Sequence, residues 1–97
     1  MTVTKTQNDT SVTLSVEGRL DTITSPDLEK EIATISDANE LTIDFAKLDY
    51  ISSAGLRVLL STHKSFAKKG GMTIINVSET VLDIFDVTGF KDILNIK

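Results

Sequence analysis

The residues best placed to do chemistry are two adjacent serines, Ser52 and Ser53, which separate a strand pattern from a helix pattern. The apolar alternation of a β-strand ends at Ile51, and helical spacing begins directly after the serines. The first backbone N–H groups of a helix have no partner within the helix, and they carry partial positive charge. A hydroxyl at that point can cap the helix, lie beside an anionic ligand, or carry a phosphate itself.

A nucleophilic serine would need a base within hydrogen-bonding distance, and His63 is the only histidine of the chain. His63 follows Ser53 by ten residues, which corresponds to about 15 Å along a helix axis. It also falls in the apolar stripe of the predicted helix, which favours a packed side chain. The G-x-S-x-G pattern of a nucleophile elbow is missing from the sequence. We therefore predict that the protein has no catalytic residues and is not an enzyme.

Sequence patterns for nucleotides and metals are missing as well. Neither G-x-x-x-x-G-K-[ST] nor G-x-G-x-x-G occurs, and Gly70-Gly71 follows a predicted helix instead of opening one. Without cysteine and with one histidine, only carboxylates could bind a hard cation. Asp21, Asp44 and Asp49 fall near predicted strand ends, either as solvated turn residues or as a cluster that a cation or a kinase could use. We predict no cofactor and no metal.

Composition and charge indicate one globular domain. The 97 residues, 40% hydrophobic and 25% charged, suffice for a single core. A net charge of −4 argues against nucleic acid or an anionic membrane as the main partner, because both favour a basic surface. No stretch approaches the ~18 apolar residues of a membrane span, and the polar start does not resemble a signal peptide. We expect a soluble, cytoplasmic protein without direct membrane insertion.

The elements that position the serines begin with a predicted β-hairpin. Residues 2–7 alternate weakly as its edge strand, and Asn8-Asp9 supplies the turn. The second strand closes in the segment 17–21, with Gly18 at a bulge or turn. Its alternating apolar residues are Val12, Leu14 and Val16.

A helix is predicted next, with Ser25 as its cap, because Pro26 and Asp27 suit a first helical turn. A break is expected from Ser36 to Glu40. The apolar stripe of this helix consists of Leu28, Ile32 and Ile35.

The second half of the chain alternates strands and helices. A third strand over residues 41–51 leads to the serines, and a helix follows over residues 56–68 until Gly70-Gly71. Residues 72–77 form a buried strand. The last predicted elements are a helix that Ser78 caps and Gly89 stops, and a short apolar piece at Phe90–Ile96 that could add a strand.

The predicted order, ββαβαβα, indicates an α/β fold. An antiparallel hairpin begins a sheet of four to five strands, and the remaining strands are largely parallel because helices connect them.

One hydroxyl suffices to cap a helix, so the second serine of the pair invites another explanation. Ala54 and Gly55 have the smallest side chains, which would let another group approach the backbone closely. Two interpretations stay open from these residues alone. Either one serine is a cap and the other incidental, or the pair marks a site of binding or modification.

The segment Asp44–Leu60 resembles the signature of bacterial anti-sigma factor antagonists, which are single STAS domains. Glu17–Asp21 resembles the G-x-L-D stretch that follows the second strand in that family, and Val81–Phe90 resembles its final-helix ending. The three motifs occur in the order of the family, and the resemblance covers nearly all of residues 1–97. It implies a single STAS domain with about three main helices packed on the mixed sheet.

The resemblance also implies partner switching. In that family the unphosphorylated protein binds an anti-sigma factor with serine kinase activity, and the sigma factor is released. Phosphorylation of a serine at a helix start ends this binding, and a PP2C-type phosphatase restores it. The usual D-S-[ST]-G-L motif aligns with Ser52–Leu56, which places the phosphorylation site at Ser53, with Ser52 as second choice. Ser52 stands where the family has Asp and is expected to be the cap, while Ala54 replaces the second hydroxyl residue.

We expect the partner to cover the serine junction and the exposed flank of the following helix. A phosphate is tolerated at a helix start, so modification should act at the interface and leave the fold intact. Two other functions stay open: an accessory or scaffold subunit of a transporter or signalling complex without phospho-switching, and a small-ligand or nucleotide-binding module. The predicted partner-binding residues are Asp21, Ser52, Ser53, Ala54, Gly55, Arg57, Val58 and Ser61.

Overall fold

The computed structural model describes residues 1–35 and 37–97. Ser36, at which the predicted break after the first helix begins, lies outside the described residues. The predicted order ββαβαβα is confirmed, and a short 3-10 turn, η1 (Phe90–Asp92), follows the last helix. The main elements are β1 (Thr2–Asn8), β2 (Ser11–Leu20), α1 (Ser25–Ala33), β3 (Glu40–Ile51), α2 (Ser53–Ala67), β4 (Gly71–Ile75) and α3 (Glu79–Thr88).

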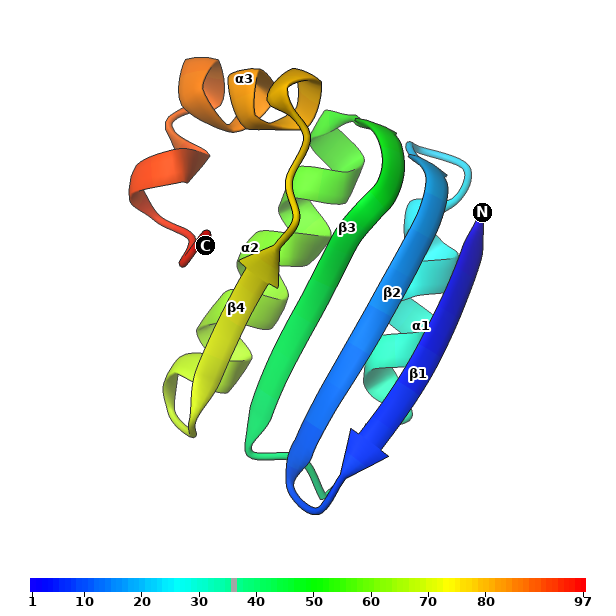
Figure 1. Cartoon of the computed structure of the whole chain (residues 1–97), viewed down its shortest axis with the longest axis vertical. Helices are drawn as coiled ribbons and strands as arrows, with labels where there is room; N and C mark the ends of the chain where they lie inside the picture. Colours follow the sequence, from blue (N-terminus) through cyan, green and yellow to red (C-terminus); the bar gives the residue numbers. More distant parts are fainter. Residues whose placement is uncertain (36) are drawn as a thin grey trace.

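The four strands form one mixed sheet in the order β1-β2-β3-β4 (Figure 1). β1 and β2 pair antiparallel through a turn in which Asp9 has a φ of 56°, whereas β2 pairs parallel with β3, and β3 with β4. The predicted hairpin and the parallel remainder are therefore both confirmed. The register between β2 and β3 shifts at Gly18, whose φ is 102°, so this glycine is a bulge inside β2. β2 continues beyond it to Leu20.

The core lies between the sheet and the helices α1 and α2, which cover the same face of the sheet (Figure 1). Alternate residues of β2, β3 and β4 point to this face and are buried, while most of their neighbours are exposed or half-buried. α1 and α2 add the apolar stripes that their spacing predicts. The largest fully buried side chains are Phe45, Phe85, Leu14, Leu20, Leu28, Leu41, Ile43, Ile51, Leu59, Ile74, Val12 and Val16.

Helix capping agrees with the prediction at Ser78 and differs from it at Ser25. Ser78 caps α3 as predicted, since its Oγ accepts a hydrogen bond from the Val81 backbone N–H at 3.3 Å. The prediction that Ser25 caps α1 is wrong: Ser25 is the first helical residue, and its hydroxyl donates to the Asp21 carbonyl at 2.5 Å. The N-cap position belongs to Thr24, and the preceding loop is organised by the Asp21 carboxylate instead.

The chain after α3 does not form the additional strand that its apolar residues suggested. Gly89 ends α3 as predicted, in the left-handed conformation with a φ of 80°, and the 3-10 turn follows at once. Only Ile96 returns to the sheet, where it forms an isolated parallel bridge with Ile74. The 3-10 turn occupies Phe90–Asp92, so this part of the apolar segment is not extended and does not pair with β4.

Candidate functional site

The two serines lie at the edge of the sheet where β2 and β3 end together. Leu20 and Ile51 are register partners, and the Ser52 backbone N–H donates to the Leu20 carbonyl at 2.9 Å. The carboxyl ends of parallel strands are the usual location of sites in α/β proteins. Figure 1 shows the loop after β2 and the start of α2 at this same edge, with the start of α2 close to α3.

Ser52 and Ser53 differ in what their hydroxyls can do. Ser52 occupies the N-cap position of α2 with extended backbone, but its Oγ is buried and has no hydrogen-bond partner among the described residues. The predicted capping position is therefore correct, while the predicted capping bond is not formed. Ser53 is the first helical residue and is exposed to solvent. Of the two hydroxyls, only that of Ser53 is open to a reagent from solution.

The small side chains after the serines have an internal explanation. Gly55 is buried, and a Cβ at this position would lie 2.8 Å from Ile51 Cγ1 and 2.9 Å from Leu20 Cγ. The group that approaches the Gly55 backbone closely is thus the end of the protein's own sheet. The close approach that a small residue at this position allows is therefore made from inside the protein at Gly55. Ala54 is half-buried beside it.

Asp21 uses its carboxylate to shape the loop next to α2. Its Oδ1 accepts hydrogen bonds from the backbone N–H groups of Ile23 (3.0 Å) and Thr24 (3.1 Å). The Thr24 backbone bond is the largest of the interactions that lower the Asp21 pKa, and desolvation opposes it. Arg19 contributes an ion pair at 3.8 Å from Oδ2, and its guanidinium also stacks 4.5 Å from the centre of the Tyr50 ring. The Asp21 side chain is thereby committed to its own loop.

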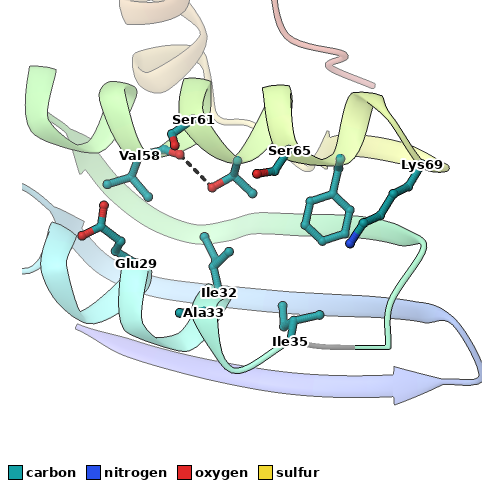
Figure 2. Close-up of a pocket in the computed structure, with 10 residues that line it drawn as sticks. Glu29, Ile32, Ala33, Ile35, Val58, Ser61, Ser65 and Lys69 are labelled. Carbon is teal, nitrogen blue, oxygen red and sulfur yellow. Dashed lines mark hydrogen bonds between the residues drawn. The ribbon is translucent and has the colours of Figure 1, made fainter.

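The predicted exposed flank of α2 is exposed only in part. Arg57 and Ser61 are open to solvent, whereas Val58 is 8% exposed because it faces α1. Figure 2 shows Val58 and Ser61 along a groove of about 280 Å³ between the two helices, opposite Ile32. The prediction that Val58 belongs to the exposed flank is therefore wrong.

Two further grooves flank the start of α2, and Arg57 borders both. The first, of about 300 Å³, lies between α2 and the end of α3, and the second, of about 390 Å³, lies between α2 and α1. The first is lined by Ser53, Leu56, Arg57, Leu60, Thr88 and Phe90. The second is lined by Thr22, Ser25, Pro26, Glu29, Ala54, Arg57, Val58 and Ser61.

Two exposed aliphatic residues near these grooves were not singled out from the sequence. Ile23, in the loop that Asp21 shapes, is 85% exposed, and Val87, beside Thr88 in α3, is 84% exposed. Ile23 could have been noticed as a lone apolar residue between threonines, and Val87 as one outside the apolar stripe of its helix. Large apolar groups left in water beside a groove are typical of interaction surfaces.

The remaining candidates do not join the serine site. His63 is half-buried in α2, and its Nδ1 has no hydrogen-bond partner within the described part of the chain. Asp44 accepts bonds from Ala46 and Asn76 near the end of β4, away from Asp21. Across residues 1–35 and 37–97, no three His, Asp or Glu side chains are grouped as metal ligands would be. In the same residues, no helix is long and apolar enough to cross a membrane.

Residues 2–97 match the STAS domain family. The anti-sigma-B factor antagonist of Bacillus subtilis is 32% identical over 92 residues, which cover 93% of this chain and 84% of that protein. The chain therefore belongs to the STAS domain family and, within it, to the anti-sigma factor antagonists.

Solved structures show the same fold. The crystal structure of an anti-sigma factor antagonist from Mycobacterium paratuberculosis is similar with a TM-score of 0.88 at 24% identity, covering 98% of this chain and 83% of that one. The Bacillus cell fate determinant SpoIIAA in its phosphorylated form is similar with a TM-score of 0.75 at 17% identity, covering 99% and 91%.

Proposed function

We propose that the protein is a cytoplasmic anti-sigma factor antagonist that works by partner switching, with Ser53 as its phosphorylation site. Unmodified, it binds an anti-sigma factor with serine kinase activity, and the sigma factor is released. Phosphorylation of Ser53 ends this binding, and a PP2C-type phosphatase reverses it. The protein acts by binding and catalyses no reaction itself.

The observation that carries the proposal is the contrast between the two hydroxyls at the start of α2. A kinase must bring the γ-phosphate in line with the acceptor oxygen, so that oxygen has to be accessible. Ser53 is exposed on the first turn, while the Ser52 Oγ is buried. The same accessibility lets the partner lie directly over Ser53. One residue can therefore both belong to the interface and be modified.

The proposed partner surface, here called the ridge, consists of the exposed residues Ser53, Arg57 and Ser61 with the half-buried residues Asp21, Ser52 and Ala54 beside them. Gly55 and Val58 lie beneath it and support it, since both are buried. Ile23 and Val87 are exposed apolar neighbours of Thr22 and Thr88, which line the two grooves, and removing such a side chain from water is worth about 1.5–3 kcal/mol. The surface thus combines apolar anchors with a central hydroxyl.

Phosphorylation is expected to change this surface and to leave the fold intact. A phosphate adds about −1.5 to −2 charges. The first turn of α2 contains no acidic residue, so the free N–H groups there favour the new charge. Against a partner, the same dianion must lose its water, which costs several kcal/mol unless it is paired. Binding therefore weakens while the folded state persists.

Phosphate transfer with site mapping tests the assignment. The protein is incubated with ATP and each candidate anti-sigma kinase of its organism, and the product is mapped by mass spectrometry. We expect one phosphate, on Ser53, that is absent from Ser53→Ala and retained by the matched control Ser52→Ala. Phosphate on Ser52 alone would overturn the assignment. If no candidate modifies or binds the protein and a nucleotide raises its stability instead, a ligand-binding role is favoured.

Ser53→Asp tests the division between interface and fold. We expect binding of the anti-sigma factor, measured by calorimetry, to weaken at least about tenfold, which corresponds to ~1.4 kcal/mol. The melting temperature should stay close to that of the wild type, because an acid at a helix start is favourable. Thr80→Asp places the same charge on the first turn of α3 and should leave binding unchanged. A large loss of stability in Ser53→Asp would contradict the interface explanation.

A further inference from the structure

Arg57 stands out on the proposed surface because it is a cation near Ser53 that forms no ion pair with any of the described residues. It is exposed and lies between the two grooves at the start of α2. The single ion pair found in residues 1–35 and 37–97 joins Arg19 to Asp21, and Arg57 takes no part in it. Glu29 also lines the second groove, but it forms no ion pair with Arg57. Arg57 is therefore available to an acidic group from outside.

Ser53 and Arg57 are neighbours on the surface of α2. Residues four apart on a helix lie on one face, with Cβ atoms about 5–6 Å apart. Both residues also line the same groove between α2 and α3. An anionic group at the first position and a cation four residues later is the favourable order of such a pair. Arginine and phosphate form strong, two-pronged hydrogen bonds.

The groove beside this pair is apolar. Besides Ser53 and Arg57, it is lined mainly by Leu56, Leu60 and Phe90. An occupant that matches both features has an aliphatic side chain for the groove and a carboxylate for the guanidinium at its rim. The positive charge of Arg57 excludes a basic occupant, because like charges placed together cost binding energy.

We propose that Arg57 binds an acidic side chain of the anti-sigma factor and that an aliphatic side chain next to this acid fills the groove between α2 and α3. Phosphorylated Ser53 then pairs with Arg57 and displaces the acidic side chain of the anti-sigma factor. This inference rests on the proposed function. In the unmodified protein, the guanidinium is offered to the partner. After modification the guanidinium pairs with the phosphate on Ser53, within the same helix. The carboxylate of the anti-sigma factor then lies beside the phosphate, and Arg57 is no longer available to neutralise it. The switch thus removes an attraction and adds a repulsion in one step.

The proposed pairing of Arg57 with phosphorylated Ser53 can be tested without the anti-sigma factor. Phosphoserine is placed at position 53 during translation, and the second proton of the phosphate is titrated by 31P NMR. We expect the phosphate of the wild type to hold that proton about threefold more weakly than that of Arg57→Gln. Lys64→Gln, an exposed cation farther along α2, should match the wild type. The difference should shrink in 1 M salt. Equal titrations of the wild type and Arg57→Gln would overturn the pairing.

The proposed contact between Arg57 and an acidic side chain of the anti-sigma factor is tested with the unmodified protein and the anti-sigma factor that binds it. Arg57→Glu is expected to weaken binding more than about tenfold and Arg57→Gln less, whereas Lys64→Glu leaves it unchanged. Ser53→Asp in the Arg57→Gln background should then weaken binding less than it does alone. Binding that survives Arg57→Glu would overturn this inference only. A wild-type protein that binds no anti-sigma factor would contradict the proposed function, while the NMR result would still stand.

Discussion

The starts of α2 and α3 look alike in sequence and differ in structure. Each helix follows a parallel strand, and each has a serine at the N-cap with extended backbone. At α3, the Ser78 Oγ accepts a bond from the backbone, and Glu79 adds an acid to the first turn. At α2, the Ser52 Oγ is bonded to none of the described residues, and the first turn has no acid. The start of α3 thus has a capping bond and an acid of its own, whereas the start of α2 has neither among the described residues.

This difference separates a structural helix start from one that is free to accept charge. A cap and an acid each stabilise a helix start by about 0.3–1 kcal/mol or more. α3 has both contributions before any partner or modification is present. α2 lacks both, so a phosphate on Ser53 would be the first anion at its N–H groups. A helix already capped and acidic would gain less from the same phosphate, because the new charge would meet an existing one.

The largest effect is expected at the third helical residue, which is Gly55 in α2 and Val81 in α3. Val81 is fully buried, whereas Gly55 has no room for a methyl group against Leu20 and Ile51. Gly55→Ala should lower the free energy of unfolding by about 1–2 kcal/mol, because overpacking exceeds the gain in helix propensity. Urea unfolding measures this value. The control Thr80→Ala, at an exposed position of α3, should stay within about 0.5 kcal/mol of the wild type. A stabilised Gly55→Ala would show that Leu20 and Ile51 move aside.

The two capping serines offer the most direct comparison. Ser78→Ala removes a formed capping bond and should cost about 1 kcal/mol of stability. Ser52→Ala removes a buried hydroxyl that has no partner in the described structure, so the free energy of unfolding should stay the same or rise slightly. Both variants are compared by urea unfolding under the same conditions. Equal losses in the two variants would mean that Ser52 forms a capping bond in solution.

Periodicity in the sequence was sufficient to predict the sheet and the helices. Apolar residues alternate in residues 12–16 and 41–45, and they follow helical spacing after Ser53. These patterns show which side chains face the core, because apolar residue types are the ones that become buried. The Gly18 bulge and the Gly89 stop were predictable because both need a backbone that glycine adopts easily. The order of the elements then determined which strand ends meet beside the serines.

The errors concern side chains whose behaviour depends on contacts between distant segments. Ser25 failed as a cap because the helix begins one residue earlier, with Thr24 at the N-cap, and the N–H groups of Asp27 and Leu28 bond to the Thr24 carbonyl. The group that approaches Gly55 was not identified because Leu20, one of its two closest neighbours, is distant in sequence. Val58 was placed on the exposed flank because spacing along α2 does not reveal that α1 packs there. Such contacts appear only once the elements are assembled.

The smallest effect is expected from Asp21, which follows β2 at the end of the sheet where α2 starts. Hydrogen bonds hold its pKa below the ordinary value of 3.8, so the ionised form stabilises the fold. A lowered pKa means that this stabilisation is complete above 3.8 and is lost as the pH falls through the folded-state pKa. The melting temperature of the wild type should therefore exceed that of Asp21→Ala at neutral pH, and the two should converge in acid. Asp83→Ala, which removes an exposed acid of α3, is the control. A gap that widens in acid would contradict the assignment, because it would require the protonated carboxyl to be the stabilising form.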